Sequence, residues 1–481
     1  MKMKLRTLAT LLLALAACHW AEAKNPYRQY TENLPFKMSE ITAPTFPINT
    51  VRLSDYDADG TGGKLCTQAF AQAIDDLVQQ GGGRLVVPCG VWLTGPIVLK
   101  DNIDLHLEAG AVIQFADDET LYPIVKTSFE GLDTRRCQSP ISATDATNVA
   151  ISGQGVIDGN GQYWRPLKRA KVTDKMWNTI VKSGGVLVRD DYWVPSEGYA
   201  KGEAGANMNV PNAKTEAEWN EIKRFLRPVM ISFVRCKNVL LEGVIFQNSP
   251  AWNIHPLMCE NVIIDNVLVR NPAYAQNGDA LDLESCRNAL IVNSKFDAGD
   301  DGICIKSGKD ADGRKRGKPC ENVVVEGCTV FAGHGGFTVG SEMSGGVHNI
   351  SVRNCQFLGT DVGLRFKSTR GRGGVVSGIY IDGISMTDIQ NEAITFDLYY
   401  GNKQKEVVAM PIDETTPEFC DIDIRHISCN GAGKAFYFNG LPEKPIRNIR
   451  LSDMHIVSKK DGEFHFCENI TKDNVKVTIR Q

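Results

Sequence analysis

Short segments in which apolar and polar residues alternate follow one another along most of the chain, beginning at residues 84–88 and 103–107. Such alternation predicts β-strands, because successive side chains of a strand point to opposite faces. From about residue 238 the segments repeat, and each starts with an asparagine followed by apolar residues. These starts are Asn238, Asn261, Asn288, Asn322, Asn349 and Asn448.

A second pattern recurs between these segments: a small residue, then two apolar residues flanking one variable position. It starts at Ala251, Ala280, Gly302, Gly336, Gly363, Ala393 and Ala435. The intervals of about 22 to 42 residues predict a solenoid in which each repeat is one coil.

Within each repeat, the two apolar residues should enter a common core, and the residues between and after them should point outward. Stacked coils then align the outward residues in a ladder along one face. The ladder comprises Asn253 and His255, Asp282 and Glu284, Cys304 and Lys306, Thr338, Arg365 and Lys367, Thr395 and Asp397, and Tyr437 and Asn439. A structural ladder would favour Asn, Thr or apolar residues, but this ladder carries mixed charges.

Two segments depart from the repeat. Residues 67–80 carry apolar residues on one helical face, with Thr67 as the expected N-cap, and we expect this helix to form part of an N-terminal cap over residues 50–90. Residues 161–227 contain no repeat but hold four of the seven tryptophans, and we expect this insert to shape a binding site. A solenoid closed by a cap has no bare end there, so a monomer is expected.

The first 23 residues have the pattern of an export signal: basic residues, an apolar run from Leu8 to Ala17, and a small-residue cleavage site. The run is too short to span a bilayer. Residues 15–18 also resemble a bacterial lipoprotein box ending at Cys18, so the mature protein is expected to be either free or lipid-anchored outside the cytoplasm. Residues 24–481 are expected to form a single domain.

Composition narrows the function only slightly. The net charge of −4 and the pI of about 6.1 give the 481-residue chain no general attraction for nucleic acid, so an anionic ligand would need local positive charges. The 14 cysteines lie singly, without the spacing of a zinc site, and several fall within apolar runs. We expect most of them to be core residues.

The candidate chemistry lies just before the repeats. Asp279 and Asp301 lie one position before the start of the repeat in two successive coils. Asp300 and His334 lie two positions before the start of the repeat, again in successive coils. Stacking therefore predicts that Asp279 lies over Asp301 and that Asp300 lies over His334. Crowded carboxylates suit the hydrolysis of a glycosidic bond, because one must be protonated while others activate water. The crowding itself raises the pKa of one of them.

At these residues the chain resembles the polygalacturonase family of glycoside hydrolases, family 28, and within it the exo-acting bacterial members. The family pattern of Asn-Thr-Asp, Asp-Asp, Gly-His-Gly and Arg-x-Lys is matched by residues 277–279, 300–301, 333–335 and 365–367. The likeness extends from about residue 50 to the end. It implies an all-β fold, a right-handed single-stranded parallel β-helix, and inverting hydrolysis of α-1,4-galacturonosyl bonds of pectin without a metal or cofactor.

The resemblance also implies individual roles. Asp300 would be the general acid, and Asp279 with Asp301 would hold and deprotonate the water, while His334 would tune the acid. Arg365 and Lys367 would bind a galacturonate carboxylate, which a guanidinium and an ammonium can clamp together. The remaining expected substrate-binding residues are Asn277, His255, Lys306 and either Tyr399 or Tyr400.

One position departs from the family pattern: Gly278 stands where many endo-acting members have Thr. With the insert as a wall beside the groove, this favours an enzyme that acts at chain ends. A galacturonate linkage within rhamnogalacturonan is an alternative substrate. Two other functions remain as rivals: a pectate lyase, which would need calcium and an arginine base, and a non-catalytic solenoid that binds cell-wall sugars, which would have no reason to cluster three aspartates.

Overall fold

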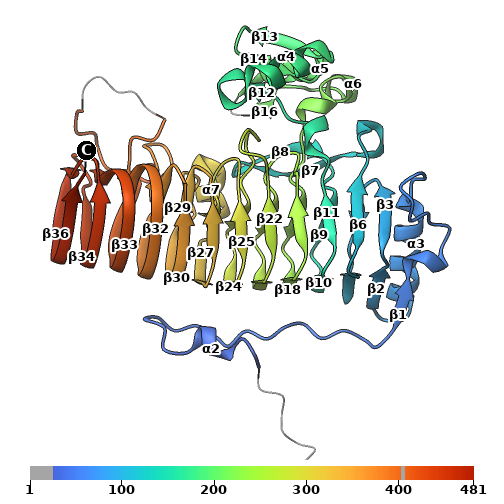
Figure 1. The fold of residues 1–481 in the computed structure, drawn as a ribbon, viewed down its shortest axis with the longest axis horizontal. Coiled ribbons are helices and arrows are strands. Elements are labelled where there is room, and N and C mark those ends of the chain that lie inside the picture. The colour runs from blue at the N-terminus through green and yellow to red at the C-terminus, as the bar shows by residue number, and fades with distance from the viewer. Residues whose placement is uncertain (1–24, 208, 402–406, 481) are drawn as a thin grey trace, which may run out of the picture.

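The computed structural model describes residues 25–207, 209–401 and 407–480, and its fold is the predicted right-handed parallel β-helix. Figure 1 shows the coils stacked along the long axis from the N-terminal end to the C-terminal end. The strands form three rows, and within each row every strand pairs in parallel with the strand of the next coil. The export signal and the lipoprotein box lie outside the described residues.

Row 1 carries the predicted ladder. Its strands are β4 (Ile97–Val98), β9 (Ile141–Thr144), β17 (Ile231–Val234), β20 (Ile254–Leu257), β23 (Leu281–Glu284), β26 (Ile303–Lys306), β29 (Gly335–Val339), β31 (Val362–Lys367) and β35 (Gly462–His465), with the ends of β32 (Val375–Asp397) and β33 (Glu418–Asn439). The pairings place Asp282 beside Cys304, Cys304 beside Thr338, and Thr338 beside Arg365, as the ladder predicted.

Rows 2 and 3 complete each coil. Row 2 contains β1 (Thr50–Arg52), β2 (Gly83–Val87), β5 (Ile103–Leu107), β10 (Thr147–Gly153), β18 (Lys237–Glu242), β21 (Glu260–Asp265), β24 (Arg287–Val292) and β27 (Cys320–Glu326). Row 3 contains β3 (Gly90–Thr94), β6 (Ala111–Phe115), β11 (Val156–Asp158), β19 (Ile245–Gln247), β22 (Leu268–Arg270), β25 (Lys295–Asp297) and β28 (Thr329–Phe331). Strands β30 (Val347–Leu358), β32, β33, β34 (Ile446–Ser458) and β36 (Cys467–Ile479) run through both rows.

The repeated asparagines form the corner that leads into row 2. Asn238, Asn261, Asn288 and Asn322 all adopt positive φ values between 54° and 57°, a conformation that asparagine tolerates better than most residues. The Nδ2 of each also donates to the Oδ1 of the asparagine one coil before, at 3.0 to 3.4 Å. The asparagines therefore shape the corner and tie adjacent coils together.

The interior of the coils is a continuous apolar core that includes most of the cysteines, as predicted. Helix α3 (Thr67–Gln79) packs five buried side chains over the N-terminal coils. Its N-cap is Cys66 and not Thr67, so the expected cap was wrong. The Thr67 hydroxyl instead accepts a hydrogen bond from the amide of Gly95 at 2.7 Å, which joins the helix to the first coil of row 1.

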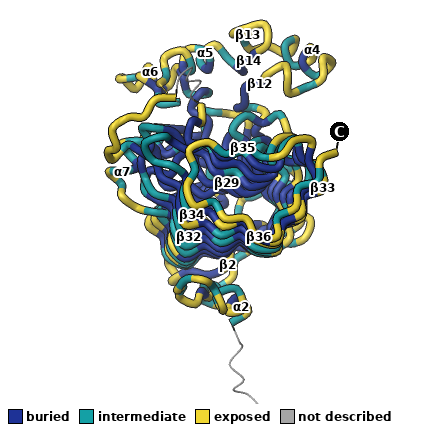
Figure 2. Tube along the Cα trace, turned by 90° about the vertical axis from the view of Figure 1, so that its left-hand side faces the viewer, coloured by how far each residue is buried: buried dark blue, intermediate teal, exposed yellow. Residues whose placement is uncertain are grey.

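Two segments project over row 1 (Figures 1 and 2). One is an antiparallel hairpin of β7 (Ile124–Phe129) and β8 (Leu132–Cys137). The other is the insert, which has its own apolar cluster around Trp164 and Phe225. Its elements are β12 (Leu167–Lys168), β13 (Val186–Arg189), β14 (Tyr192–Val194), β15 (Ala206–Asn207), β16 (Val210–Pro211), α4 (Asp174–Lys182), α5 (Glu197–Ala204) and α6 (Glu216–Glu221).

Residues 25–49 run along the outside of row 2, below the coils in Figure 1, and include α2 (Arg28–Thr31). Tyr27 and Ile41 are buried there against outward-facing apolar residues of row 2, among them Leu240 and Ile263. The remaining described helices are α7 (Asp310–Arg316), which follows β26, and single 3₁₀ turns at Leu53–Asp55, Glu119–Leu121, Gly161–Tyr163, Arg169–Lys171 and Lys223–Phe225. Within the described ranges no helix is long and apolar enough to cross a membrane.

Candidate active site

The coil stacking brings the predicted catalytic residues together at the start of the row 1 strands. Carboxylate oxygens of Asp279, Asp300 and Asp301 all lie within 4.8 Å of one another. The Nδ1 of His334 hydrogen-bonds Oδ1 of Asp300 at 3.0 Å, and the amide of Ala280 donates to the carbonyl of Asp301. Both predicted inter-coil contacts are therefore present.

Asp301 is a carboxyl of this group whose charged form the protein stabilises. It is fully buried, and its two oxygens accept hydrogen bonds from Arg365 Nη1 at 2.9 Å and Lys367 Nζ at 2.7 Å. Although burial raises the pKa of a carboxyl, the nearby ammonium and guanidinium charges outweigh it and hold the pKa of Asp301 well below its usual range. The two cations expected to bind a sugar acid thus already neutralise a carboxylate of the protein.

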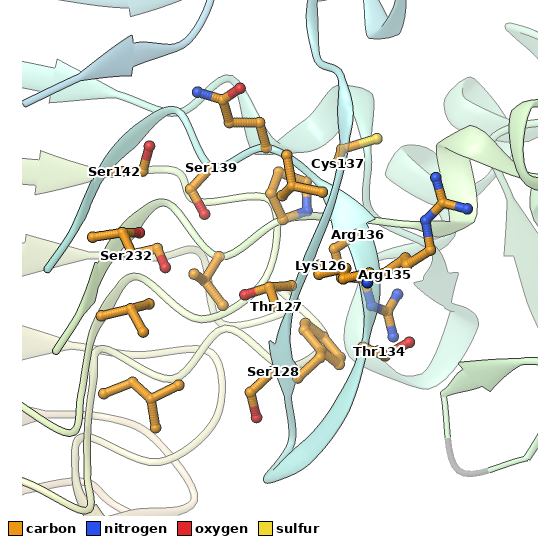
Figure 3. Close-up of a pocket in the computed structure, with 18 of the residues that line it drawn as sticks. Lys126, Thr127, Ser128, Thr134, Arg135, Arg136, Cys137, Ser139, Ser142 and Ser232 are labelled. Atoms are coloured by element: carbon orange, nitrogen blue, oxygen red, sulfur yellow. The ribbon is translucent and has the colours of Figure 1, made fainter.

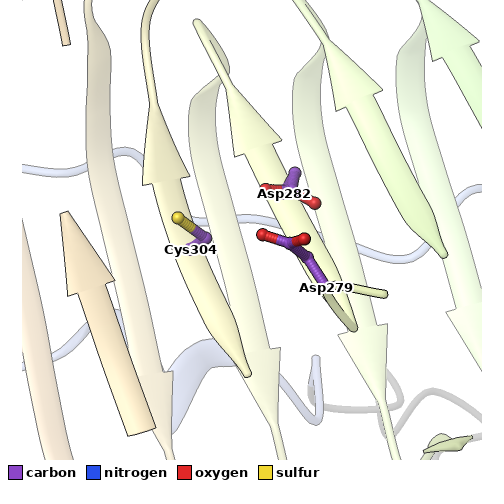
Figure 4. A group of neighbouring side chains, drawn as sticks. All are labelled: Asp279, Asp282 and Cys304. Carbon is purple, nitrogen blue, oxygen red and sulfur yellow. The ribbon is translucent and has the colours of Figure 1, made fainter. Parts of the chain in front are cut away.

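The crowding acts on Asp279 and on Asp282, which lies on the ladder but was not predicted as a site residue. Figure 4 shows both carboxyl groups facing one another beside Cys304. Burial, reinforced by the neighbouring carboxylates, raises the pKa of Asp279 and of Asp282 well above the ordinary value. Among the described residues, neither Asp282 oxygen has a hydrogen-bond partner, and Lys306 Nζ lies 3.6 Å from Oδ1.

Two groups of side chains in this region have the spacing of metal ligands: Asp279 with Asp282 and Cys304, and Asp279 with Asp300 and Asp301. In both groups, protein cations stand where a metal would supply charge. Lys306 lies beside the first group, and Arg365 and Lys367 bind the second. The positive charges of these lysine and arginine side chains would repel a divalent cation, so the arrangement is better suited to chemistry by carboxylates alone.

A small cavity of about 240 Å³ opens beside the carboxylates. It is lined by Glu130, Trp252, Asn277, Asp279, Asp300, Lys306, Lys309, Ser341, Glu342, Lys367, Arg372 and Tyr400. Ligand pockets for drug-sized molecules measure about 300 to 1,000 Å³. A cavity of this size is therefore suited to a single sugar unit.

The other predicted binding residues divide into those at the cavity and those away from it. Tyr400 lines the cavity, with its ring 4.9 Å from Lys367 Nζ, whereas Tyr399 is buried against Arg370 and does not line it. His255 does not line the cavity, because its Nε2 hydrogen-bonds the buried Glu284 at 2.8 Å.

Asn277 and Lys306 line the cavity while bonded to the protein. Asn277 bridges Arg227 and Glu130, each at 3.0 Å, and Lys306 donates to Glu342 at 2.8 Å. Next to Asn277, a Cβ at Gly278 would lie only 2.6 Å from Cβ of Ala275. The turn leaves no room for the Thr of the family pattern.

The hairpin β7–β8 forms the wall beside the cavity, a role that the sequence had assigned to the insert. Phe129 stacks on Trp252 with ring centroids 5.8 Å apart, and the carbonyl of Gly131 at the hairpin tip accepts from the amide of Lys309 at 3.1 Å. Beyond the wall is a larger cavity of about 730 Å³, shown in Figure 3, which lies over β9, β17 and β20 and includes none of the site carboxylates. The hairpin thus divides the ladder face.

The insert braces this wall and reaches the site at one point. Glu216 on α6 accepts a bidentate pair from Arg135 of the hairpin, and the buried Arg136 donates to the carbonyl of Phe225 at 3.0 Å. Lys171, at the end of a 3₁₀ turn, has its Nζ 3.0 Å from Nε2 of His334. Both nitrogens of the imidazole therefore have partners, Asp300 on one side and the insert on the other.

Sequence reasoning missed several cavity residues. Glu342 follows a ladder strand, and Lys309 lies three residues after Lys306, so the repeat could have located them. Glu130 and Arg372 come from the hairpin tip and from a loop after β31, and the repeat contains no signal for either.

A β-helix that gathers carboxylates and a histidine across three adjacent coils has the architecture of a glycoside hydrolase. Comparison with known proteins identifies the family: residues 210–477 match the glycosyl hydrolases family 28, and the chain belongs to that family, as the resemblance implied. The protein is accordingly a glycosidase.

Similar proteins cover most of the chain. A probable polygalacturonase of Vitis vinifera is 26% identical, in an alignment that covers 87% of this chain and 77% of the relative. An exo-poly-alpha-D-galacturonosidase of Dickeya chrysanthemi is also 26% identical, and the alignment covers 90% of this chain and 73% of that relative. The crystal structure of a hyperthermoactive exopolygalacturonase from Thermotoga maritima superposes with a TM-score of 0.76 at 34% identity, covering 91% of this chain and 94% of that one.

Proposed function

We propose that the protein hydrolyses α-1,4-galacturonosyl linkages of pectin from the chain end and releases single galacturonate units. The observation that carries this proposal is the small cavity of about 240 Å³ beside the three carboxylates. The hairpin blocks the ladder face on one side of it, which favours a polymer that enters by its end. The exo-acting relatives support the same mode.

Exposure separates the roles of the three carboxyl groups. The Asp300 side chain is 24% exposed and faces the cavity, so it is the group that can reach the leaving oxygen as general acid. His334, held by Lys171 on its other nitrogen, positions that acid. Asp301 is ionised and acts as the base for the attacking water, which Asp279 holds by a hydrogen bond.

Arg365 and Lys367 link substrate binding to this base. Both contact Asp301, and Lys367 with Tyr400 also lines the cavity. The carboxylate of the galacturonate next to the terminal unit, when it shares these two cations, weakens their hold on Asp301 and makes it a stronger base. The uronic acid thereby promotes its own hydrolysis, which explains why cations lie beside a catalytic carboxylate.

Inversion is part of the proposal on the strength of the family resemblance. Inverting glycosidases usually separate their carboxyl groups by about 6.5 to 9.5 Å, whereas here the nearest oxygens lie within 4.8 Å. The stereochemical outcome is therefore tested directly: NMR of the first product formed from an α-linked substrate should show the β anomer.

The main test is product analysis with polygalacturonate. We expect the wild type and an Asp461→Asn control, altered at an exposed residue, to release single galacturonate units, and the Asp300→Asn variant to release none. Mixed oligomers would overturn the chain-end mode. Products that absorb ultraviolet light would indicate a lyase, and activity only on rhamnogalacturonan fragments would shift the substrate to that polymer.

Location and assembly complete the proposal. The N-terminal export pattern supports a periplasmic or extracellular enzyme, either free or lipid-anchored at Cys18, where pectic polymers or oligogalacturonides are met as substrates. The protein acts as a monomer and binds no nucleic acid, in line with its weakly acidic composition.

A further inference from the structure

Four cationic side chains line the small cavity, and three of them are paired with carboxylates of the protein. Lys306 donates to Glu342 at 2.8 Å, Lys367 binds Asp301 at 2.7 Å, and Arg372 binds Asp310. Lys309 differs: within the described parts of the chain, its ammonium has no hydrogen-bond acceptor and no ion-pair partner.

Lys309 as a whole is only 6% exposed, but its ammonium is not among the buried atoms that lack a partner, so it is open to the cavity that the residue lines. The nearest compensation is Glu342, whose pKa is held low by Lys306 first and then by Lys309. Since Glu342 carries one negative charge and already binds Lys306, this end of the cavity keeps an excess of positive charge.

The backbone fixes the position of Lys309 from both sides. Its amide donates to the carbonyl of Gly131 at the hairpin tip at 3.1 Å, and its carbonyl accepts from the amide of Gly313 in α7 at 3.0 Å. Lys309 therefore lines the cavity at the place where the wall meets the coil. An anion in the cavity would give its ammonium a partner.

We propose that Lys309 binds the carboxylate of the terminal galacturonate and makes the cavity selective for a uronic acid over a neutral sugar. This inference rests on the proposed function and adds a specificity residue to it. Hydroxyl groups can be bound equally well by Glu130, Asn277 and Ser341, which also line the cavity. Only an anion can neutralise the ammonium, so charge is the property that Lys309 selects.

The test compares galacturonate with galactose, which has a neutral group in place of the carboxylate. We expect the wild type to bind galacturonate more tightly in calorimetry and the Lys309→Met variant to lose this preference, with galacturonate affinity falling about tenfold to a hundredfold. Lys309→Arg should retain most of the preference. Lys315→Met, which removes an exposed lysine of α7, should leave it unchanged.

Kinetics on polygalacturonate supply a second readout. For Lys309→Met we expect KM to rise and kcat to change less, because the contact is made before the reaction. Thermal unfolding of each variant shows whether it is folded. If Lys309→Met is not folded, Lys309→Gln takes its place in the comparison.

The inference is overturned if the Lys309→Met variant keeps the galacturonate preference, if galactose binding falls equally, or if the wild type binds no galacturonate. Failure of the proposed function gives a different result: the wild type would bind galacturonate with the expected dependence on Lys309 and yet release no product from polygalacturonate.

Discussion

Replacing Asp301 by asparagine should destabilise the fold far more than the same change at Asp300, although both changes should abolish activity. Asp301 is fully buried and accepts hydrogen bonds from Lys367 and Arg365, whose side chains are 7% and 18% exposed. Removing one partner of a buried ion pair leaves an uncompensated charge and costs about 3 to 5 kcal/mol. Here two cations are left, and an asparagine amide cannot neutralise either.

Asp300 is the matched control because its side chain is partly exposed and, within the described ranges, pairs with His334 alone. Partly exposed ion pairs contribute about 0 to 1 kcal/mol. Urea unfolding near neutral pH should therefore separate the two variants by about 2 to 5 kcal/mol. A double variant, Asp301→Asn with Lys367→Met, should recover part of the loss, because it removes one of the orphaned charges.

The dependence on pH identifies the cause. Because its two cations hold the pKa of Asp301 below the unfolded value of about 3.9, the stabilisation is fully present above that pH and is lost as pH falls through the folded pKa. The gap between wild type and Asp301→Asn should thus be constant above about pH 5 and should narrow below about pH 4. Equal stabilities of the Asp301 and Asp300 variants near neutral pH would refute the reasoning.

Three further changes test other parts of the site. Asp282→Asn should gain stability relative to wild type as pH rises above about 4, because burial and neighbouring charges raise the pKa of Asp282; urea midpoints that differ by the same amount at every pH would contradict this. Tyr400→Ala should raise KM on polygalacturonate about threefold to tenfold, since its ring packs on Arg365 and Lys367 and lines the cavity, whereas Tyr399→Ala should leave KM nearly unchanged. Treatment with a chelator should not lower the rate of product release, because protein cations already supply the positive charge at the carboxylates; a loss restored by calcium would point to the lyase.

The repeat allowed the sequence to predict which candidate residues the coils bring together. Strand side chains alternate with a period of two, and the strands of adjacent coils stack at a constant spacing of about 4.8 Å. Counting back from each repeat therefore converts sequence position into spatial position. This is why the contact between Asp300 and His334, and the approach of Asp279 to Asp301, could be predicted without coordinates.

The same reasoning misjudged what covers the ladder. It described the ladder as an outward face, yet His255, Asp282 and Lys306 are all at most 3% exposed. It also assigned the wall to the insert and gave residues 24–49 no role of their own. The hairpin builds the wall instead, and residues 25–49 dock on row 2 through Tyr27 and Ile41.

The sequence by itself determined the coil, the phase of the carboxylates and the family, because each depends on residues that a fixed repeat relates to one another. Only the tertiary structure decided which charges are paired and which segments form the walls of the cavity. Those features depend on contacts between segments far apart in the chain, such as Lys309 with Gly131, and no periodicity links their positions. The opposite pKa shifts of two ladder-face carboxyls follow from such contacts: burial and neighbouring carboxylates raise the pKa of Asp282, whereas Lys367 and Arg365 lower that of the buried Asp301.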